Sequence, residues 1–101
     1  MSLRPELSTK IKEAIKNNSF TSDIMWGLAL MPKCIDHVEK DGIELSPTQE
    51  MRSINFTWGD KIITAFLLDA KDGSKIWGCY STIELQDGKT RSRYLGYSFN
   101  N

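Results

Sequence analysis

The first part of the chain carries apolar residues at the spacing of an amphipathic helix. They recur every four residues at Leu3, Leu7, Ile11 and Ile15. Lysines and a glutamate occupy the opposite side of the helical wheel, which is typical of a surface helix. Pro5 suits the first turn, where its missing N–H leaves no bond unmade, and an asparagine pair suits the end. We therefore expect a helix that reaches about residue 17.

A second helix is expected after a short polar stretch. Three consecutive residues there carry short side-chain oxygens that can cap a first turn: Thr21, Ser22 and Asp23. The apolar run that follows, 24–31, also alternates as a strand would, so it fits two patterns. The cap favours the helical interpretation, which we adopt.

Pro32 lies directly after this apolar run. Because proline has no N–H and its ring clashes with the preceding turn, we expect it to break or kink the helix. Residues 33–40 could then form a further short helix, which would end at Gly42, a residue type that tolerates the left-handed conformation of a helix end.

From about residue 51 the period of the pattern changes from helix to strand. Apolar Ile54, Phe56 and Trp58 alternate with polar neighbours, which indicates a strand with one buried face. Three glycine-containing pairs then favour tight hairpin turns: Gly59-Asp60, Asp72-Gly73 and Asp87-Gly88. The expected strands are 51–58, 61–71, 74–86 and 89–99.

Together these elements predict an α+β fold in a single domain, residues 1–101. The N-terminal helical part, 3–41, is expected to pack on one face of a four-stranded antiparallel β-meander, 51–99. Gly78 and Gly96 lie inside predicted strands, so we expect curvature or a close approach at these positions.

Two-residue turns at the three glycine pairs would decide which residues face each other across the sheet. The pairs predicted in this way are Phe56 with Ile63, Leu68 with Trp77, Phe66 with Cys79, Gly96 with Cys79, and Tyr80 with Leu95. In this register one face is almost wholly apolar or aromatic, and this face should receive the helices.

The other face of the predicted sheet mixes small hydroxyl side chains with a central apolar patch. We predict that this patch is a ligand-binding or interface face, made of Phe66, Leu68, Trp77, Cys79 and Tyr94. Three explanations remain open for it. In the first, the segment 26–31 covers the patch. In the second, two copies of the chain dimerise through their sheets. In the third, a different partner or a small ligand binds there.

Charge narrows the classes of function. The 13 basic and 13 acidic residues give a net charge of zero, which argues against a dedicated nucleic-acid binder. A protein that binds single-stranded nucleic acid remains a third interpretation, because cations and a stacking ring lie on one predicted strand at Arg91, Arg93 and Tyr94. The longest apolar run, 24–31, is far shorter than the about 20 residues that span a membrane. The polar N-terminal residues do not resemble a signal peptide, so we expect a cytoplasmic protein.

The sharpest local charge feature of the chain is acidic. Asp36, Glu39, Asp41 and Glu44 follow one another closely, with Lys40 as the one lysine or arginine among them. A localised patch of charge speeds association with an oppositely charged partner even when the net charge is zero. We predict that these four residues bind a partner protein.

Candidate catalytic and metal-binding groups are sparse. Cys34 and His37 form a C-x-x-H pair, but a zinc site needs four ligands, and the chain has one further cysteine, Cys79, and no second histidine. No phosphate-binding loop or nucleophile elbow occurs in the sequence. We therefore predict no catalytic residue, no metal and no cofactor.

The function expected from these patterns is a non-catalytic intracellular protein-binding module. Its most concrete form is a bacterial inhibitor or immunity-type protein, which would block a basic partner such as a nuclease with the acidic segment. The alternative is a small-ligand-binding domain or an enzyme that uses the aromatic face of a curved sheet.

Overall fold

The computed structural model describes residues 3–17 and 24–100 and confirms the predicted α+β fold class. Two helices, α1 (Pro5–Asn17) and α2 (Ile24–Lys40), precede four strands. The strands are β1 (Ser53–Trp58), β2 (Lys61–Asp69), β3 (Lys75–Glu84) and β4 (Thr90–Phe99). They form one antiparallel sheet in the order β1-β2-β3-β4, which is the predicted meander.

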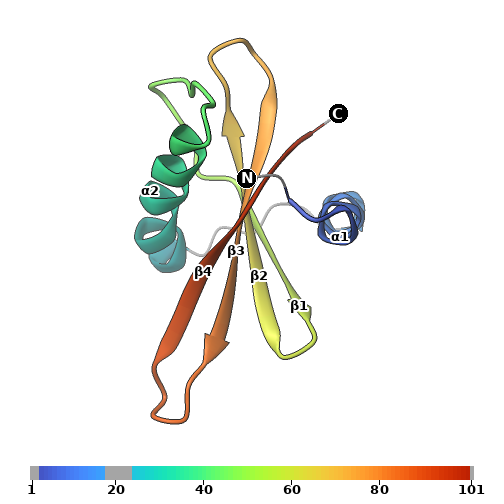
Figure 1. The fold of residues 1–101 in the computed structure, drawn as a ribbon, viewed down its shortest axis with the longest axis vertical. Helices are drawn as coiled ribbons and strands as arrows, with labels where there is room; N and C mark the ends of the chain where they lie inside the picture. Colours follow the sequence, from blue (N-terminus) through green and yellow to red (C-terminus); the bar gives the residue numbers. More distant parts are fainter. Residues whose placement is uncertain (1–2, 18–23, 101) are drawn as a thin grey trace.

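The two helices lie on opposite faces of the sheet, so the prediction that both would share one face is wrong. Figure 1 views the sheet along its edge and shows α2 on one side and α1 on the other. The central strands explain this arrangement, because six successive residues of β2, from Ile63 to Leu68, are all buried. A strand that is apolar on both faces needs cover on both faces.

Beneath α1, the buried Leu7 and Ile11 pack in one hydrophobic cluster with Ile63, Ala65 and Trp77 of the sheet. The main-chain N–H of Leu3 donates a hydrogen bond of 2.7 Å to the carbonyl oxygen of Tyr97, which ties the segment before α1 to β4. Full burial of a large apolar side chain contributes about 1.5–3 kcal/mol, so this cluster holds α1 on the sheet.

Beneath α2, a second hydrophobic cluster joins Cys34 and Val38 to Phe66, Leu68 and Ile76. This cluster lies on the face opposite to the first, because Phe66 and Leu68 alternate along β2 with Ala65 and Leu67, which pack with α1. The sheet therefore contributes side chains to two separate cores.

Of the two outcomes predicted at Pro32, a break or a kink, the break does not occur, because α2 continues through this residue. Pro32 is exposed, whereas Leu30 and Met31 before it and Cys34 after it are buried against the same sheet face. Packing on both sides of the proline offsets the loss of one helical hydrogen bond, because tertiary contacts supply most of the stability of a protein helix.

The β1–β2 hairpin has the predicted register. Phe56 faces Ile63 and Trp58 faces Lys61, with Gly59 at a φ of 65° in the turn. A two-residue turn that begins with glycine at positive φ is the expected type II′ geometry.

The β2–β3 register differs from the prediction by one residue. Leu68 faces Ile76 rather than Trp77, and Phe66 faces Gly78 rather than Cys79. The loop explains the shift, since the N–H of Gly73 bonds to the carbonyl of Ala70, and the N–H of Ala70 bonds to the carbonyl of Ser74. This is a three-residue loop that ends with a left-handed glycine, not the predicted two-residue turn.

The β3–β4 hairpin repeats this loop type and adds a bulge. Gly88 has a φ of 80°, and Glu84 faces Thr90. Because this loop has three residues rather than the predicted two, Tyr80 faces Tyr94 instead of Leu95. The register then shifts by one residue at the bulge between Cys79 and Tyr80. Beyond this bulge Cys79 faces Gly96, as predicted. Gly96 has a φ of 121°, a conformation in which glycine is strongly favoured.

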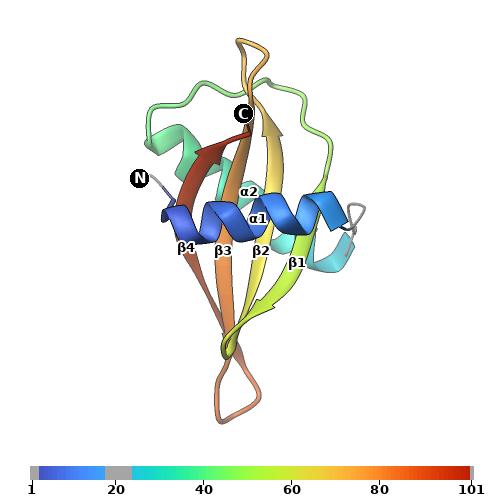
Figure 2. The ribbon, with the colours of Figure 1, turned by 90° about the vertical axis from the view of Figure 1, so that its right-hand side faces the viewer.

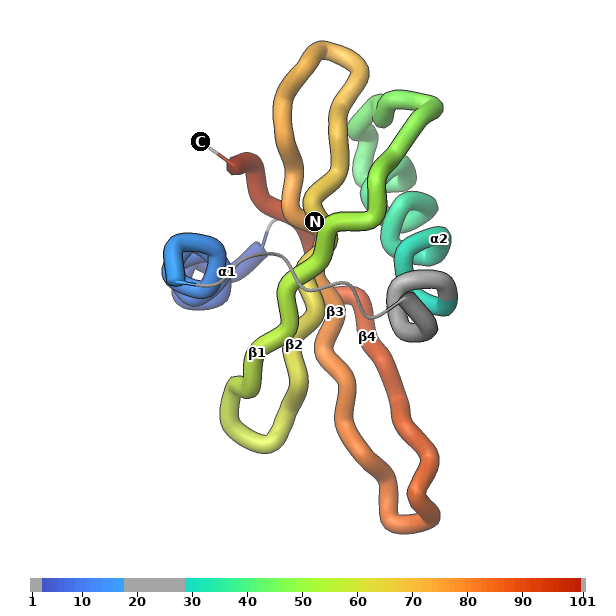
Figure 3. Tube along the Cα trace, turned by 180° about the vertical axis from the view of Figure 1, so that it is seen from behind, coloured from blue at the N-terminus to red at the C-terminus, as the bar shows by residue number. Residues whose placement is uncertain are grey.

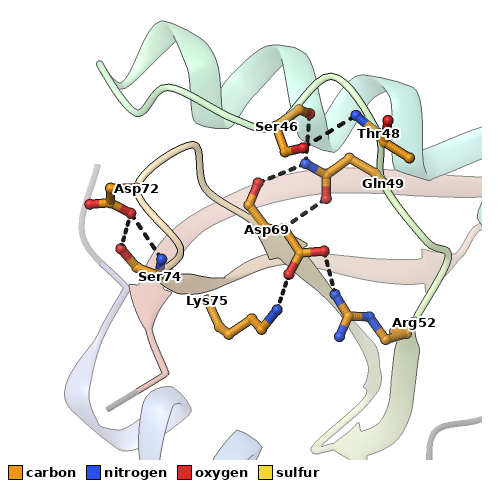
Figure 4. A network of polar contacts seen from close by, with 8 residues as sticks. All are labelled: Ser46, Thr48, Gln49, Arg52, Asp69, Asp72, Ser74 and Lys75. Atoms are coloured by element: carbon orange, nitrogen blue, oxygen red, sulfur yellow. Dashed lines mark hydrogen bonds and ion pairs between the residues drawn. The ribbon is translucent and has the colours of Figure 1, made fainter.

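The segment between α2 and β1 is anchored by the end of β2. Figure 3 follows it from α2, past the β2–β3 hairpin, to β1. Figure 4 shows the network that holds it: the side chain of Gln49 donates to the carbonyl of Asp69 (2.7 Å) and accepts from its N–H (2.8 Å). The Asp69 carboxylate accepts hydrogen bonds from Arg52, at 2.8 Å, and from Lys75. These two cations lower the pKa of Asp69, with the Lys75 contact as the larger cause.

In the part of the chain that the structure describes, neither helix is long and apolar enough to cross a membrane.

Candidate functional site

The predicted acidic residues gather at the C-terminal end of α2. Asp36 and Glu39 lie on α2 and are exposed, Glu44 is exposed in the segment that follows, and Asp41 is half-buried between them. Figure 1 places this end of α2 near the β2–β3 loop, on the side of the sheet away from α1. The structure thus brings the four residues to one region of the surface.

The end of α2 has the geometry that its sequence predicts. The N–H of Gly42 bonds to the carbonyl of Glu39 at 3.0 Å, and the N–H of Ile43 bonds to the carbonyl of Val38 at 3.4 Å. This pair of bonds is a Schellman motif, which requires the left-handed φ of 94° seen at Gly42. Ile43 and Val38 also pack in the same hydrophobic cluster, so the chain turn that presents Asp41 and Glu44 is rigidly closed.

Asp41 is held by an aromatic cluster from the sheet. The Tyr94 hydroxyl donates a hydrogen bond of 2.8 Å to Asp41 Oδ2, and the Tyr94 ring stacks on His37, with centroids 4.6 Å apart. Burial, with the Asp41 carboxylate as a further cause, raises the pKa of Tyr94, so the phenol remains a donor. The hydrogen bond from Tyr94 therefore fixes the position of Asp41 and connects the end of α2 to β4.

The other three carboxylates are available at the surface. Within residues 3–17 and 24–100, Asp36, Glu39 and Glu44 form no ion pair. Glu39 lies in the last turn of α2, where the helix dipole already carries partial negative charge. A carboxylate at this end lowers the stability of the helix, so helix stability does not explain why Glu39 occupies this position.

The second predicted site does not form. The structure divides its five residues between the two cores: Phe66, Leu68 and Tyr94 pack beneath α2, and Trp77 and Cys79 pack beneath α1. All are buried except Tyr94, which is half-buried. The one-residue shift in the β2–β3 register turns Trp77 and Cys79 to the face opposite Phe66. The face proposed for a sheet-to-sheet homodimer is therefore covered by α2.

The burial of Cys34 argues against a metal-ligand or nucleophile role for the C-x-x-H pair of Cys34 and His37. Cys34 is completely buried, and burial raises the pKa of its thiol to about 12. Burial also raises the pKa of Cys79. A thiol becomes a nucleophile only as the thiolate, so both groups are unreactive in the folded state. Among the described residues, no three His, Cys, Asp or Glu side chains lie together as a metal-ion ligand set.

Sequence reasoning missed a groove on the α1 side of the sheet. It has a volume of about 450 Å³ and lies between the start of α1, the β1–β2 turn and β4. Its charged residues are Arg4, Lys61, Arg93 and Asp60, and Trp58 forms part of its wall. Two features of the sequence could have indicated this groove. The β1–β2 register, which was predicted correctly, pairs Trp58 with Lys61. Arg93 lies on the side of β4 opposite to Tyr94.

In comparisons with known proteins, no family model, no curated protein and no solved structure matches this chain.

Proposed function

We propose that this chain is a non-catalytic protein-binding domain, an inhibitor or immunity-type protein, that engages a positively charged partner through the acidic end of α2. The observation that carries the proposal is the set of exposed carboxylates of Asp36, Glu39 and Glu44, which have no ion-pair partner in the described ranges. A surface of this kind attracts a basic partner over a distance of about 8 Å at physiological salt.

The position of these charges supports a binding role over a structural one. Glu39 adds negative charge where the α2 dipole is already negative, which lowers the stability of the helix. Residues that oppose the local stability of their own element are expected at functional surfaces. The Schellman turn and the Tyr94 hydrogen bond hold this surface in one shape, so little conformational entropy is lost on binding.

The state of the thiols and the histidine favours binding over catalysis. Both cysteines are buried and free, and their raised pKa values keep them protonated. The single histidine, His37, stacks on Tyr94. We place the protein in the cytoplasm, where a reducing environment keeps free cysteines reduced.

The test compares wild-type protein with the D36N/E39Q/E44Q variant and with a matched control. The control is E6Q/E13Q, which neutralises two exposed glutamates of α1 on the other side of the sheet. Each protein is immobilised and exposed to a nuclease-treated extract of the native host. We expect a protein that wild type and control retain and that the triple variant loses.

The retained protein is then purified, and its association rate with each variant is measured at several salt concentrations. Neutralisation of the three carboxylates should lower the association rate by about tenfold or more at low salt and flatten its salt dependence. A partner that binds the triple variant as fast as wild type would show that the acidic end of α2 is not the binding surface.

A further inference from the structure

The groove on the α1 side of the sheet has the size of a small-molecule site. Figure 2 shows α1 crossing the strands, and within residues 3–17 and 24–100 no helix covers the end of the sheet with the β1–β2 turn on this face. The groove lies there, with Arg4 at one wall and the turn from Trp58 to Lys61 at another. Its volume of about 450 Å³ lies within the range of about 300–1,000 Å³ found for small-ligand sites.

The inner part of the groove is apolar. Leu7 and Ile63, each about 1% exposed, line it, and half-buried Leu95 and Trp58 extend this surface outwards. These four residues belong to the hydrophobic cluster beneath α1, so the groove opens onto the side of a packed core. An apolar surface of this kind favours a ligand with a hydrocarbon or aromatic body.

The outer part of the groove is positively charged. Arg4, Lys61 and Arg93 are exposed and line it, against the single carboxylate of Asp60. In the described ranges none of the three cations forms an ion pair, although the chain as a whole has a net charge of zero. The excess of positive charge in the groove is therefore local and does not reflect the net charge of the chain.

We infer that this groove binds a small organic anion, with an apolar body against Leu7, Ile63 and Trp58 and a carboxylate or phosphate head between Arg4 and Arg93. The arginine guanidinium presents a fork of N–H donors that matches both kinds of head group. The site lies on the sheet face opposite to α2, so this inference does not rest on the proposed binding of a basic partner.

The test uses three probes of similar apolar body: 4-phenylbutyrate, 4-phenylbutyl phosphate and the neutral 4-phenylbutanol. Each is titrated into the ¹⁵N-labelled 101-residue chain, and amide and indole shifts are followed by NMR. Saturable shifts should map to Trp58, Lys61 and Leu95, around the groove. At least one anion should bind about tenfold or more tightly than the neutral probe, and the tighter of the two anions identifies the head group.

Variants then locate the charge that the anion contacts. R4Q/R93Q should weaken anion binding by about tenfold and leave the neutral probe unchanged, and both positions are exposed, so the fold should be retained. The control K10Q/K16Q removes two exposed cations of α1 that do not line the groove, and it should bind as wild type does. Equal binding of anions and the neutral probe, anion binding unaffected by R4Q/R93Q, shifts that map elsewhere, or no saturable binding would each overturn the inference.

Discussion

The side chain of Cys34 lies directly over the backbone of Gly78. A Cβ at Gly78 would lie 2.3 Å from Cys34 Sγ, which is closer than real contacts allow, and 3.2 Å from Cγ2 of Val38, which is tight. The absence of a side chain at Gly78 therefore lets α2 approach β3, and it confirms the close approach predicted for this glycine.

This contact predicts that Gly78→Ala destabilises the protein by about 1–3 kcal/mol, because an extra methyl group overpacks the core beneath α2. Removal of Sγ by Cys34→Ala should free most of the required space. We therefore expect Gly78→Ala to cost less in the Cys34→Ala background than alone. Urea unfolding of the four proteins in this cycle measures the difference, and strictly additive effects would contradict the packing described here.

Two neighbouring tyrosines should respond in opposite ways to loss of their hydroxyls. The Tyr80 hydroxyl is buried and has no hydrogen-bond partner in the described part of the chain, whereas the Tyr94 hydroxyl bonds to Asp41. Tyr80→Phe should be neutral or stabilising by up to about 1 kcal/mol, and Tyr94→Phe should destabilise by about 1 kcal/mol. Thermal and urea unfolding compare the two; the reverse order would exclude this hydrogen-bond arrangement.

Glu6 and Glu39 lie at opposite ends of their helices, so the helix dipole should affect them with opposite sign. Glu6 lies in the first turn of α1, where negative charge is favourable, and Glu39 lies in the last turn of α2, where it is not. Glu39→Gln should stabilise the protein and Glu6→Gln should destabilise it, each by about 0.3–1 kcal/mol at low salt. Both effects should shrink at high salt. Stabilisation by both substitutions would point to general charge repulsion instead.

The Asp69 network predicts a sensitivity to acid. Because Lys75 and Arg52 lower the pKa of Asp69 in the folded state, the carboxylate contributes stability that is complete above its unfolded pKa. This contribution is lost as the pH falls below the unfolded value of about 3.9 and through the lower folded pKa. Asp69→Asn should lower stability at pH 7 by about 1 kcal/mol and reduce the further loss between pH 5 and acid. An unchanged pH profile in this variant would assign the acid sensitivity to other carboxylates.

The two cysteines should be inert in the folded protein. Burial raises the pKa of the Cys34 thiol to about 12 and also raises that of Cys79. A disulfide reagent at pH 8 should therefore react with neither thiol in native buffer and with both in 6 M guanidinium chloride. Rapid modification of one thiol in native buffer would mean that its helix opens readily from the sheet.

The candidate site was only partly predictable. The acidic residues are surface groups, so their exposure follows from their chemistry, and the structure adds the contact of Asp41 with Tyr94. The groove combines Arg4, Trp58 and Arg93, which are far apart in the chain and meet only because α1 crosses the sheet. No local pattern encodes that crossing.

The sequence by itself determined the types and order of the elements, the β1–β2 register and the helix end at Gly42, because each depends on local backbone chemistry. Tertiary structure decided the path of α2 through Pro32, the face that each helix covers and the registers of β3 and β4. The pair Asp72-Gly73 is compatible with loops of two or three residues, and only glycine has positive φ among the described residues. This rules out the two-residue type I′ turn, which needs positive φ at both positions. A one-residue difference reverses every side chain of a strand, so the faces follow from how both sides of the sheet are packed.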